Sequence, residues 1–402
     1  MSVFSNFINK FTGRTTRVWG TGNSSVYRSR EIEDSEICTG ILDCNATHIA
    51  RGKVLHVVED VDGRIKQIKR TSEYTRLFER PNPIMNHHDF MYAMAWQLQV
   101  MNTAYAWIKW DKRMHPVEIW PLVYLSFELH KRTDGGFAVK ITDTTGEQFL
   151  VRTEDLIVLR RKYDGTGFAG RGNGEIRETI GMVNSVDEGL KQALNVSNKI
   201  HGILTNKKTM LANEDKHGDE TMARLENAAK NGGILTLDSM ESYQPLDPKT
   251  WSANAVQSKQ IVDRLYNYWR TPESVVNNTA TESIMQNYYE SLVEPIWEIM
   301  SSEFTNALFT RKEQGFGNKI LVTSSAANSA SWQTKLNIIQ ESKEVGLLMV
   351  NELRELIGYG PLEDGDVRLV SLNYVKSTDQ SKYQTGKEDN NGEGNGQDSS
   401  KD

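Results

Sequence analysis

Residues 268–300 read YWRTPESVVNNTATESIMQNYYESLVEPIWEIM and place a short polar loop between two helical patterns. The loop consists mainly of Asn, Thr, Val and Ser, it has no histidine or cysteine, and Glu273 is its ionisable side chain. Such a loop is too polar to belong to a core and too poor in reactive groups to form an active site. What the loop is for depends on the helices beside it and on the rest of the chain.

Both ends of the loop carry helix-start signals. The motif Thr271-Pro272-Glu273 has threonine in the N-cap position and proline at the first helical position. Thr279 and Glu282 have the Thr-x-x-Glu spacing of a capping box. The loop is therefore predicted to be a short connection held in a fixed place.

Three long helices are predicted in this half of the chain. Residues 251–270 lead into the loop and residues 280–311 lead out of it. The second of these contains Pro295, which lacks an amide donor and crowds the carbonyl group of Ser291, so a bend is predicted there. An earlier helix over residues 174–201 has roughly 28 residues and a length of about 40 Å.

This earlier helix has a ridge of small side chains. Gly181, Ser185, Gly189 and Ala193 recur every four residues and therefore lie along one side of the helix. Each interior glycine costs about 1 kcal/mol relative to alanine, and an isolated helix gains nothing in return. A helix packed against copies of itself does gain, because small side chains permit short distances between helix axes. The ridge predicts packing between subunits, with chance placement as the alternative.

The composition is that of a soluble protein, with 38% hydrophobic and 25% charged residues and a formal net charge of -6. Nothing approaches the run of about 18 apolar residues that spans a bilayer. The first residues lack the apolar core of a signal peptide, so we expect no membrane association and a chain that stays in the cytoplasm where it is made. An acidic chain also lacks the basic excess of proteins that grip nucleic acid. If it meets DNA, we expect it to let the DNA pass.

The first half of the chain is typical of an α+β body. A helix is predicted over residues 37–50, where Cys38 and Cys44 point to different faces, which argues against a disulfide between them. Residues 54–160 combine a β-hairpin with an Asp62-Gly63 turn, a helix and several short strands.

The two ends of the chain differ from this body. Near the N-terminus, Phe4, Phe7, Ile8 and Phe11 form an apolar helical stripe, which we interpret as packing on a neighbouring subunit rather than on a membrane. After residue 376 the sequence has almost no apolar residue and is predicted to be disordered.

One motif imitates an enzyme site. Gly165-x-Gly167-x-x-Gly170 follows a strand and precedes a helix, as in a dinucleotide-binding fingerprint. Charged residues between 160 and 164 separate the strand from the glycines, and the next helix is too long for a compact βαβ unit. The sequence contains no Walker A, zinc-binding or serine-nucleophile motif. We therefore predict no catalytic residues, metal or cofactor, with a nucleotide-binding enzyme that uses the Gly165–Gly170 loop as the alternative.

Four stretches together resemble a known family. They are RLFERPNPIMNHHDFMYAMAWQLQVMNTAYAWIKWD (76–111), EIWPL (118–122), GILTLDSMESYQPL (233–246) and GLLMVNELRELIGYGPLEDGD (346–366). In their order and spacing they resemble the portal proteins of tailed double-stranded DNA bacteriophages, in the branch typical of long-tailed phages. The loop departs from the family, which often has Pro-Pro after Gly-Val, so the loop's shape is left open.

The resemblance implies an elongated α+β subunit that assembles into a ring. Its parts would be an N-terminal arm (1–31), a mixed wing body (32–173), a stem helix (174–201), a small α/β clip (202–246), a second stem helix (247–270), a tunnel loop (271–280), a long kinked helix with a return wing strand (281–330), a helical crown (331–375) and a disordered tail (376–402).

The resemblance also implies a function. The ring, generally a dodecamer in the virion, would be the conduit for double-stranded DNA at one capsid vertex. The clip would dock the packaging motor with its large terminase and later the head–tail adaptor, and the major capsid protein would surround the ring. Asn277, Asn278, Thr279 and Ser274 would project into the channel, where neutral side chains make weak, sequence-blind contacts with phosphates. An ordinary turn between two helices is the alternative for this loop. A non-conduit DNA-binding scaffold is a further alternative.

Overall fold

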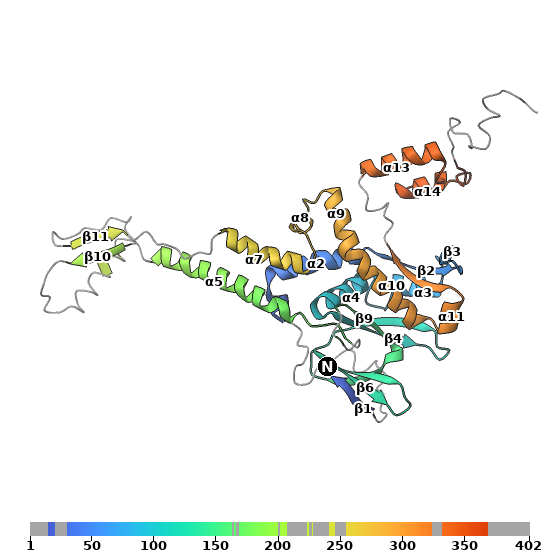
Figure 1. Ribbon diagram of the computed structural model, residues 1–402, viewed down its shortest axis with the longest axis horizontal. Coiled ribbons are helices and arrows are strands. Elements are labelled where there is room, and N and C mark those ends of the chain that lie inside the picture. The colour runs from blue at the N-terminus through green and yellow to red at the C-terminus, as the bar shows by residue number, and fades with distance from the viewer. Residues whose placement is uncertain are drawn as a thin grey trace, which may run out of the picture.

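The computed structural model describes residues 15–20, 30–162, 165, 169–199, 202–206, 223, 224, 227, 241–245, 255–323 and 332–368. They form a body of helices and strands, from which two long helices run side by side toward a small two-stranded sheet (Figure 1). A further pair of helices lies on another side of the body (Figure 1). The elongated α+β subunit that the sequence predicts is confirmed.

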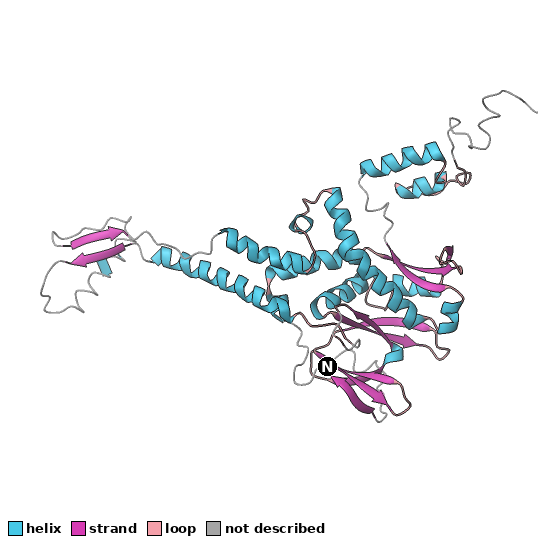
Figure 2. Ribbon diagram, in the orientation of Figure 1, coloured by secondary structure: helices cyan, strands magenta, loops and turns pink. Residues whose placement is uncertain are grey.

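The strands of the body form three small antiparallel sheets (Figure 2). In order across each sheet, they are β1 (Thr15–Gly20), β6 (Ser126–Arg132), β7 (Phe137–Thr142) and β8 (Gln148–Arg152); β5 (Pro116–Leu122), β4 (Thr103–Trp110) and β9 (Leu156–Arg160); and β12 (Asn318–Thr323), β2 (Lys53–Glu59) and β3 (Ile65–Ile68). The hairpin of β2 and β3 turns at Gly63, whose φ of 74° favours glycine, as the sequence predicts.

Helices cover these sheets. They are α1 (Arg30–Asp34), α2 (Glu36–Ala50), α3 (Glu73–Glu79), α4 (His87–Met101), α10 (Glu294–Leu308), α11 (Arg311–Gly315) and the 3₁₀ turn η1 (Thr153–Asp155). One apolar cluster joins α2, α4 and α10 to the sheets, and it includes Ile49, Met94 and Phe304, each with 0% of its surface exposed. Cys38 and Cys44 both lie in α2 and are free thiols.

The two long helices are rooted in a second cluster. They are α5 (Arg177–Lys199), preceded by the 3₁₀ turn η2 (Gly174–Ile176), and α7 (Ala255–Tyr268). Ile180 of α5 and Leu265 of α7 are buried in this cluster, and so is Trp269 just after α7. Burying a side chain such as Leu265 contributes about 1.5–3 kcal/mol, so the point at which the loop begins is firmly held. Both helices are shorter than predicted, because the first turn of residues 174–201 is 3₁₀ and the second helix ends before Trp269.

The predicted helix over residues 280–311 is divided into three parts. They are α9 (Glu282–Tyr288), the π-helical turn η3 (Tyr289–Val293) and α10, and before them lies the short α8 (Glu273–Val276). The small sheet at the far end of the long helices pairs β10 (Gly202–Asn206) with β11 (Glu241–Pro245). The separate helical pair is α13 (Trp332–Val345) and α14 (Val350–Leu356), and Thr334 of α13 donates a hydrogen bond to Glu282 of α9 over 2.7 Å.

Strand β1 was not predicted. It lies within the predicted N-terminal arm and pairs along its length with β6, from Thr15 opposite Arg132 to Gly20 opposite Glu128. The sequence TTRVWG is short and stands among Gly- and Ser-containing segments, so its pairing depends on the partner strand more than 100 residues later. Strand β1 therefore joins this N-terminal segment to the sheet of β6, β7 and β8.

Two predictions concern residues outside the described part. They are the apolar stripe Phe4, Phe7, Ile8 and Phe11, and the disordered tail 376–402. Among the described residues, no helix combines the length and the apolar character that crossing a membrane requires.

Candidate functional site

The loop between α7 and α9 is a compact turn built around α8. The amide of Asn278 donates to the carbonyl of Val275 over 3.3 Å, and the amide of Thr279 donates to the carbonyl of Ser274 over 2.8 Å. Asn278 itself has φ 56°, which asparagine tolerates better than most residues. These two bonds and the left-handed residue make a Schellman motif at the end of α8. The loop therefore has a defined backbone.

The predicted caps of the loop are partly wrong. Pro272, not Thr271, is the N-cap residue of α8, and no side chain caps that helix. The next helix begins at Glu282 with Thr281 as its N-cap, so Thr279 and Glu282 do not form a capping box. Instead, the amide of Thr279 closes the turn after α8 by donating to the carbonyl of Ser274, and the new helix starts two residues later.

The two faces of the loop have different environments. Val275 is 1% exposed and belongs to the core cluster of α2 and α10, which holds the middle of the loop against the body. Asn277, Asn278 and Thr279 are exposed, and Ser274 is half-buried. The loop thus presents three neutral polar side chains next to one another, from a backbone that is fixed on its other side.

A buried hydrogen-bond network lies under the loop. The side chain of Asn45 in α2 accepts hydrogen bonds at Oδ1 from the hydroxyls of Thr271 (2.9 Å) and Tyr288 (2.8 Å). Its Nδ2 donates to Oε1 of Gln99 in α4 over 2.8 Å. Thr271 belongs to the predicted helix-start motif, but no motif pointed to a network. For Asn45 and Gln99, the sequence signal was only a polar residue within the apolar face of α2 and of α4.

The turn η3 follows this network directly. Its first residue, Tyr289, has its hydroxyl 3.0 Å from Nδ1 of His48 in α2. Burial, with a smaller effect of the charge on Arg51, lowers the pKa of His48 to about 4, so the imidazole is neutral near pH 7. Pro295 lies in the first turn of α10, just after η3, where the helical hydrogen-bond pattern changes. The bend at Pro295 stays a prediction.

The predicted ridge on α5 faces open space. Gly181 and Ser185 are exposed, Gly189 is half-buried, and a β-carbon added at either glycine would meet nothing within 4 Å. The hydroxyl of Ser185 donates to the carbonyl of Gly181 over 2.8 Å. The side chain of Ala193 lies outside the described residues. Nothing in the single chain explains the small side chains at the described positions.

The Gly165–Gly170 loop is packed differently from a nucleotide-binding turn. A β-carbon at Gly170 would collide with the backbone carbonyls of Asn102 and Arg161, and the amide of Gly170 donates to the hydroxyl of Thr103 over 2.8 Å. The close approach is therefore to the start of β4. Gly165 has φ 93° and open space around it, and Gly167 lies outside the described residues.

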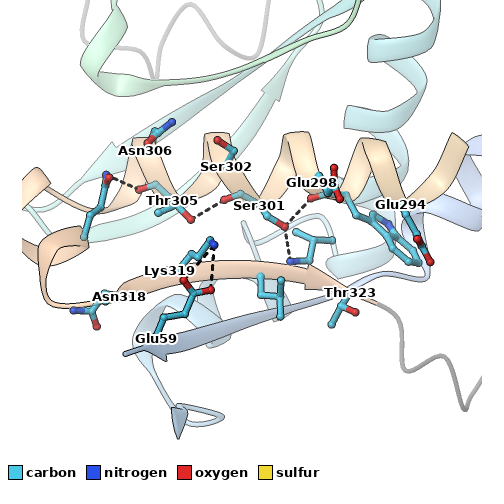
Figure 3. Close-up of a pocket in the computed structure, with 15 residues that line it drawn as sticks. Glu59, Glu294, Glu298, Ser301, Ser302, Thr305, Asn306, Asn318, Lys319 and Thr323 are labelled. Carbon is cyan, nitrogen blue, oxygen red and sulfur yellow. Dashed lines mark hydrogen bonds and ion pairs between the residues drawn. The ribbon is translucent and has the colours of Figure 1, made fainter. Parts of the chain in front are cut away.

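A surface groove of about 720 Å³ lies between α10 and β12 (Figure 3). The hydroxyls of Ser301 and Thr305 in this groove have structural roles. Ser301 accepts a hydrogen bond from the amide of Val322, and Thr305 accepts one from the amide of Ile320. Lys319 is 3.1 Å from Glu59 across the sheet. Within the described ranges, no group of three or more His, Cys, Asp and Glu side chains is placed to hold a metal ion. The groove does not present a recognisable catalytic arrangement.

The described geometry therefore favours an elongated structural subunit. A family model described as phage portal protein matches residues 43–358. The chain belongs to the phage portal protein family. The resemblance predicted from the sequence is confirmed, and with it the role of a structural portal protein at the capsid vertex of the virion.

Solved structures with the same fold are distant in sequence. The neck of an empty GTA particle computed with C6 symmetry has a TM-score of 0.65 and 14% identity, covering 87% of this chain and 96% of that chain. The neck of a native GTA particle computed with C12 symmetry has a TM-score of 0.63 and 14% identity, with the same coverage. The virion of a native gene transfer agent particle has a TM-score of 0.63 at 14% identity, covering 88% and 97%. A comparison with curated proteins finds no match.

Proposed function

We propose that copies of this chain form a ring, a dodecamer in the virion, whose central channel carries double-stranded DNA during packaging and ejection. The C12 and C6 symmetries named for the similar neck structures support a ring. The open ridge at Gly181, Ser185 and Gly189 supports close packing of α5 against a neighbouring copy. Negative-stain microscopy of the purified protein tests this proposal: rings with a central hole support it, and discrete globules contradict it.

Each part of the subunit is assigned to one part of a portal ring. We assign residues 32–173 to the wing, α5 and α7 to the stem, residues 202–246 to the clip, and residues 331–375 to the crown. Because β10 and β11 lie beyond the far ends of α5 and α7 (Figure 1), the clip is well placed to meet the large terminase and later the head–tail adaptor. The major capsid protein is then the natural neighbour of the wing.

The loop after α7 is assigned to the channel. The observation that carries this assignment is the set of exposed, neutral side chains Asn277, Asn278 and Thr279 on a turn whose opposite side is buried through Val275. Neutral amides and hydroxyls contact phosphate oxygens without releasing counterions, so each contact is weak and independent of sequence. A ring of such contacts suits a duplex that must slide.

Adding charge to the loop tests the channel assignment. We choose Asn277→Lys with Thr279→Lys, because Asn278 has a positive φ that lysine adopts with strain. In a dodecamer this change adds about 24 cations that neutralise phosphates and hold DNA in a salt-dependent way. Packaging should stall at low salt and recover partly as salt rises, because screening shortens the reach of each charge.

Two control variants separate the loop's charge from other effects. Asn277→Gln with Thr279→Ser changes the same positions without charge and should package normally. Ser302→Lys with Asn306→Lys adds the same number of lysines to the exposed side of α10, in the surface groove, and should also package normally. The measurement is the length of DNA packaged in procapsids that carry each variant. Full-length packaging by the double-lysine variant at low salt would show that the loop does not line the channel.

A further inference from the structure

The two segments that flank the loop meet at one atom. Thr271, at the start of the loop just before α8, and Tyr288, at the far end of α9, both donate to Oδ1 of Asn45. Thr271 lies 226 residues and Tyr288 lies 243 residues from Asn45 in sequence, so these contacts exist only in the folded chain. Because one hydroxyl precedes the loop's exposed residues and the other follows them beyond α9, a single acceptor ties the start of the loop to the end of α9.

Hydrogen bonds on the other side of the Asn45 amide fix the orientation of this acceptor. Nδ2 of Asn45 donates to Oε1 of Gln99, and Nε2 of Gln99 donates to the carbonyl of Ala95 over 3.2 Å. Asn45 and Gln99 have 0% exposure, Thr271 has 2% and Tyr288 has 1%. Water therefore has little access to replace a lost partner, and turning the Asn45 amide would break three hydrogen bonds together.

The two donors do not depend on Asn45 equally. The hydroxyl of Thr271 also lies 3.2 Å from the carbonyl of Trp269, which can share its proton. The hydroxyl of Tyr288 is deeply buried, and burial raises its pKa above the ordinary value, so it keeps its proton and remains a donor. Loss of the acceptor should therefore affect the α9 end of the loop more than the α7 end.

We propose that Asn45 is the positioning residue of the loop: its amide oxygen holds the start of the loop and the far end of α9, and so determines where the body presents Asn277, Asn278 and Thr279. Val275 anchors the middle of the loop by apolar contact, and Asn45 anchors the segments on either side of it by hydrogen bonds. The value of this placement to DNA passage rests on the proposed function, whereas the anchoring itself does not.

Isosteric substitutions at the two donors test the proposal with little risk to folding. Thr271→Val and Tyr288→Phe each remove one hydroxyl and keep nearly the same shape, and Asn45→Leu removes the acceptor. Tyr92→Phe is the matched control, because the hydroxyl of Tyr92 donates over 2.7 Å to Asp43 on an exposed part of α2. The measurement is amide hydrogen exchange by mass spectrometry on the full-length assembled protein, with peptides that cover the loop, α2, α4 and α7.

Each donor variant should raise exchange in the loop about three- to tenfold, as expected for the loss of one hydrogen bond, with Tyr288→Phe at the upper end. Peptides from α4 and from residues 255–265 should keep the exchange of the parent protein, and Tyr92→Phe should leave the loop unchanged. Equal loop exchange in Tyr288→Phe and Tyr92→Phe would overturn the proposal. A uniform rise in α2, α4 and α7 would also overturn it, because the network would then stabilise the whole body rather than place the loop.

The same variants keep this proposal separate from the channel assignment. If exchange in the loop rises but DNA packaging stays normal, Asn45 positions the loop and the loop does not act in the channel. If packaging fails in the double-lysine variant while exchange is unaffected by Thr271→Val and Tyr288→Phe, the loop acts in the channel and its anchor is elsewhere.

Discussion

The exposed edge of one body sheet is covered by a helix rather than by another strand. In the sheet β12-β2-β3, β12 is an edge strand, and its unpaired amides would otherwise be free to bind another chain. The amide of Val322 donates to Oγ of Ser301 over 2.8 Å (Figure 3). The amide of Ile320 donates to Oγ1 of Thr305 over 2.9 Å. Each hydroxyl also donates to the carbonyl four residues earlier in α10. Two side chains one turn apart thus satisfy one edge of β12.

Removing these hydroxyls should measurably lower the stability of the body. Ser301→Ala and Thr305→Val each leave an amide of β12 without a partner, at residues that are 4% exposed for Val322 and 0% exposed for Ile320. An unsatisfied buried donor costs about 1–3 kcal/mol, so each variant should lose that much and the double variant roughly 2–6 kcal/mol. For a domain of this size each kcal/mol lowers the melting temperature by roughly 2–4 °C.

The assay is a thermal melt at fixed subunit concentration, because assembly makes the apparent stability depend on concentration. Ser302→Ala is the control, since Ser302 is the next residue on α10 and is exposed. It should melt within a degree or so of the parent protein, because surface substitutions usually change stability by about 0.5 kcal/mol or less. If Ser301→Ala melts together with Ser302→Ala, the hydroxyl of Ser301 does not support the strand edge, and the reasoning fails.

Two further variants test other parts of the body. Gly170→Ala should severely reduce the yield of folded protein, because the added β-carbon would collide with backbone carbonyls. Gly172→Ala is the control and should express normally, because its β-carbon would meet nothing within 4 Å. Equal yields would contradict the packing of this loop on β4. The depressed pKa of His48, about 4 against an unfolded value of 6.5, predicts full stability above pH 6.5 and a progressive loss as pH falls toward 4, approaching about 3 kcal/mol in total. Urea midpoints at pH 7 and pH 5 should therefore differ less in His48→Gln than in the parent, and an unchanged difference would show that His48 is not the sensitive group.

Local signals predicted the local structure well. The helix predicted over residues 37–50 is found at Glu36–Ala50, and the Asp62-Gly63 turn joins β2 and β3 as expected, because helix periodicity and turn chemistry act over a few residues. The loop after α7 was also placed correctly between two helices. Its capping box was wrong because the same Thr279 can close one turn or start the next, and the choice depends on the packing of Val275 in the core.

Pairings between distant segments could not be predicted in the same way. Strand β1 is stabilised by its pairing with β6. The sequences of the two strands, TTRVWG for β1 and SFELHKR for β6, contain no pattern that predicts this pairing. The division of the helix before α10 into α9, η3 and α10 was likewise not foreseen as a π turn, although Pro295 marked the region. Tyr288 and Tyr289, at this turn, contact Asn45 and His48 on α2. The conformation of the turn therefore depends on a helix that is far away in sequence.

The candidate site depends both on local sequence signals and on contacts between distant segments. The sequence could therefore predict which side chains the loop exposes, but not how they are positioned. The side chains that the loop exposes follow from its composition, since Asn277, Asn278 and Thr279 are polar and stand between helix signals. Their position in space follows from Asn45, a polar residue surrounded by Ile41, Leu42, Ala46 and Ile49 in α2. A polar residue in such a face is costly to bury unless partners reach it, so its presence indicates a network without saying which residues complete it. For this subunit, the partners are Thr271 at the start of the loop, Tyr288 at the end of α9, and Gln99 in α4.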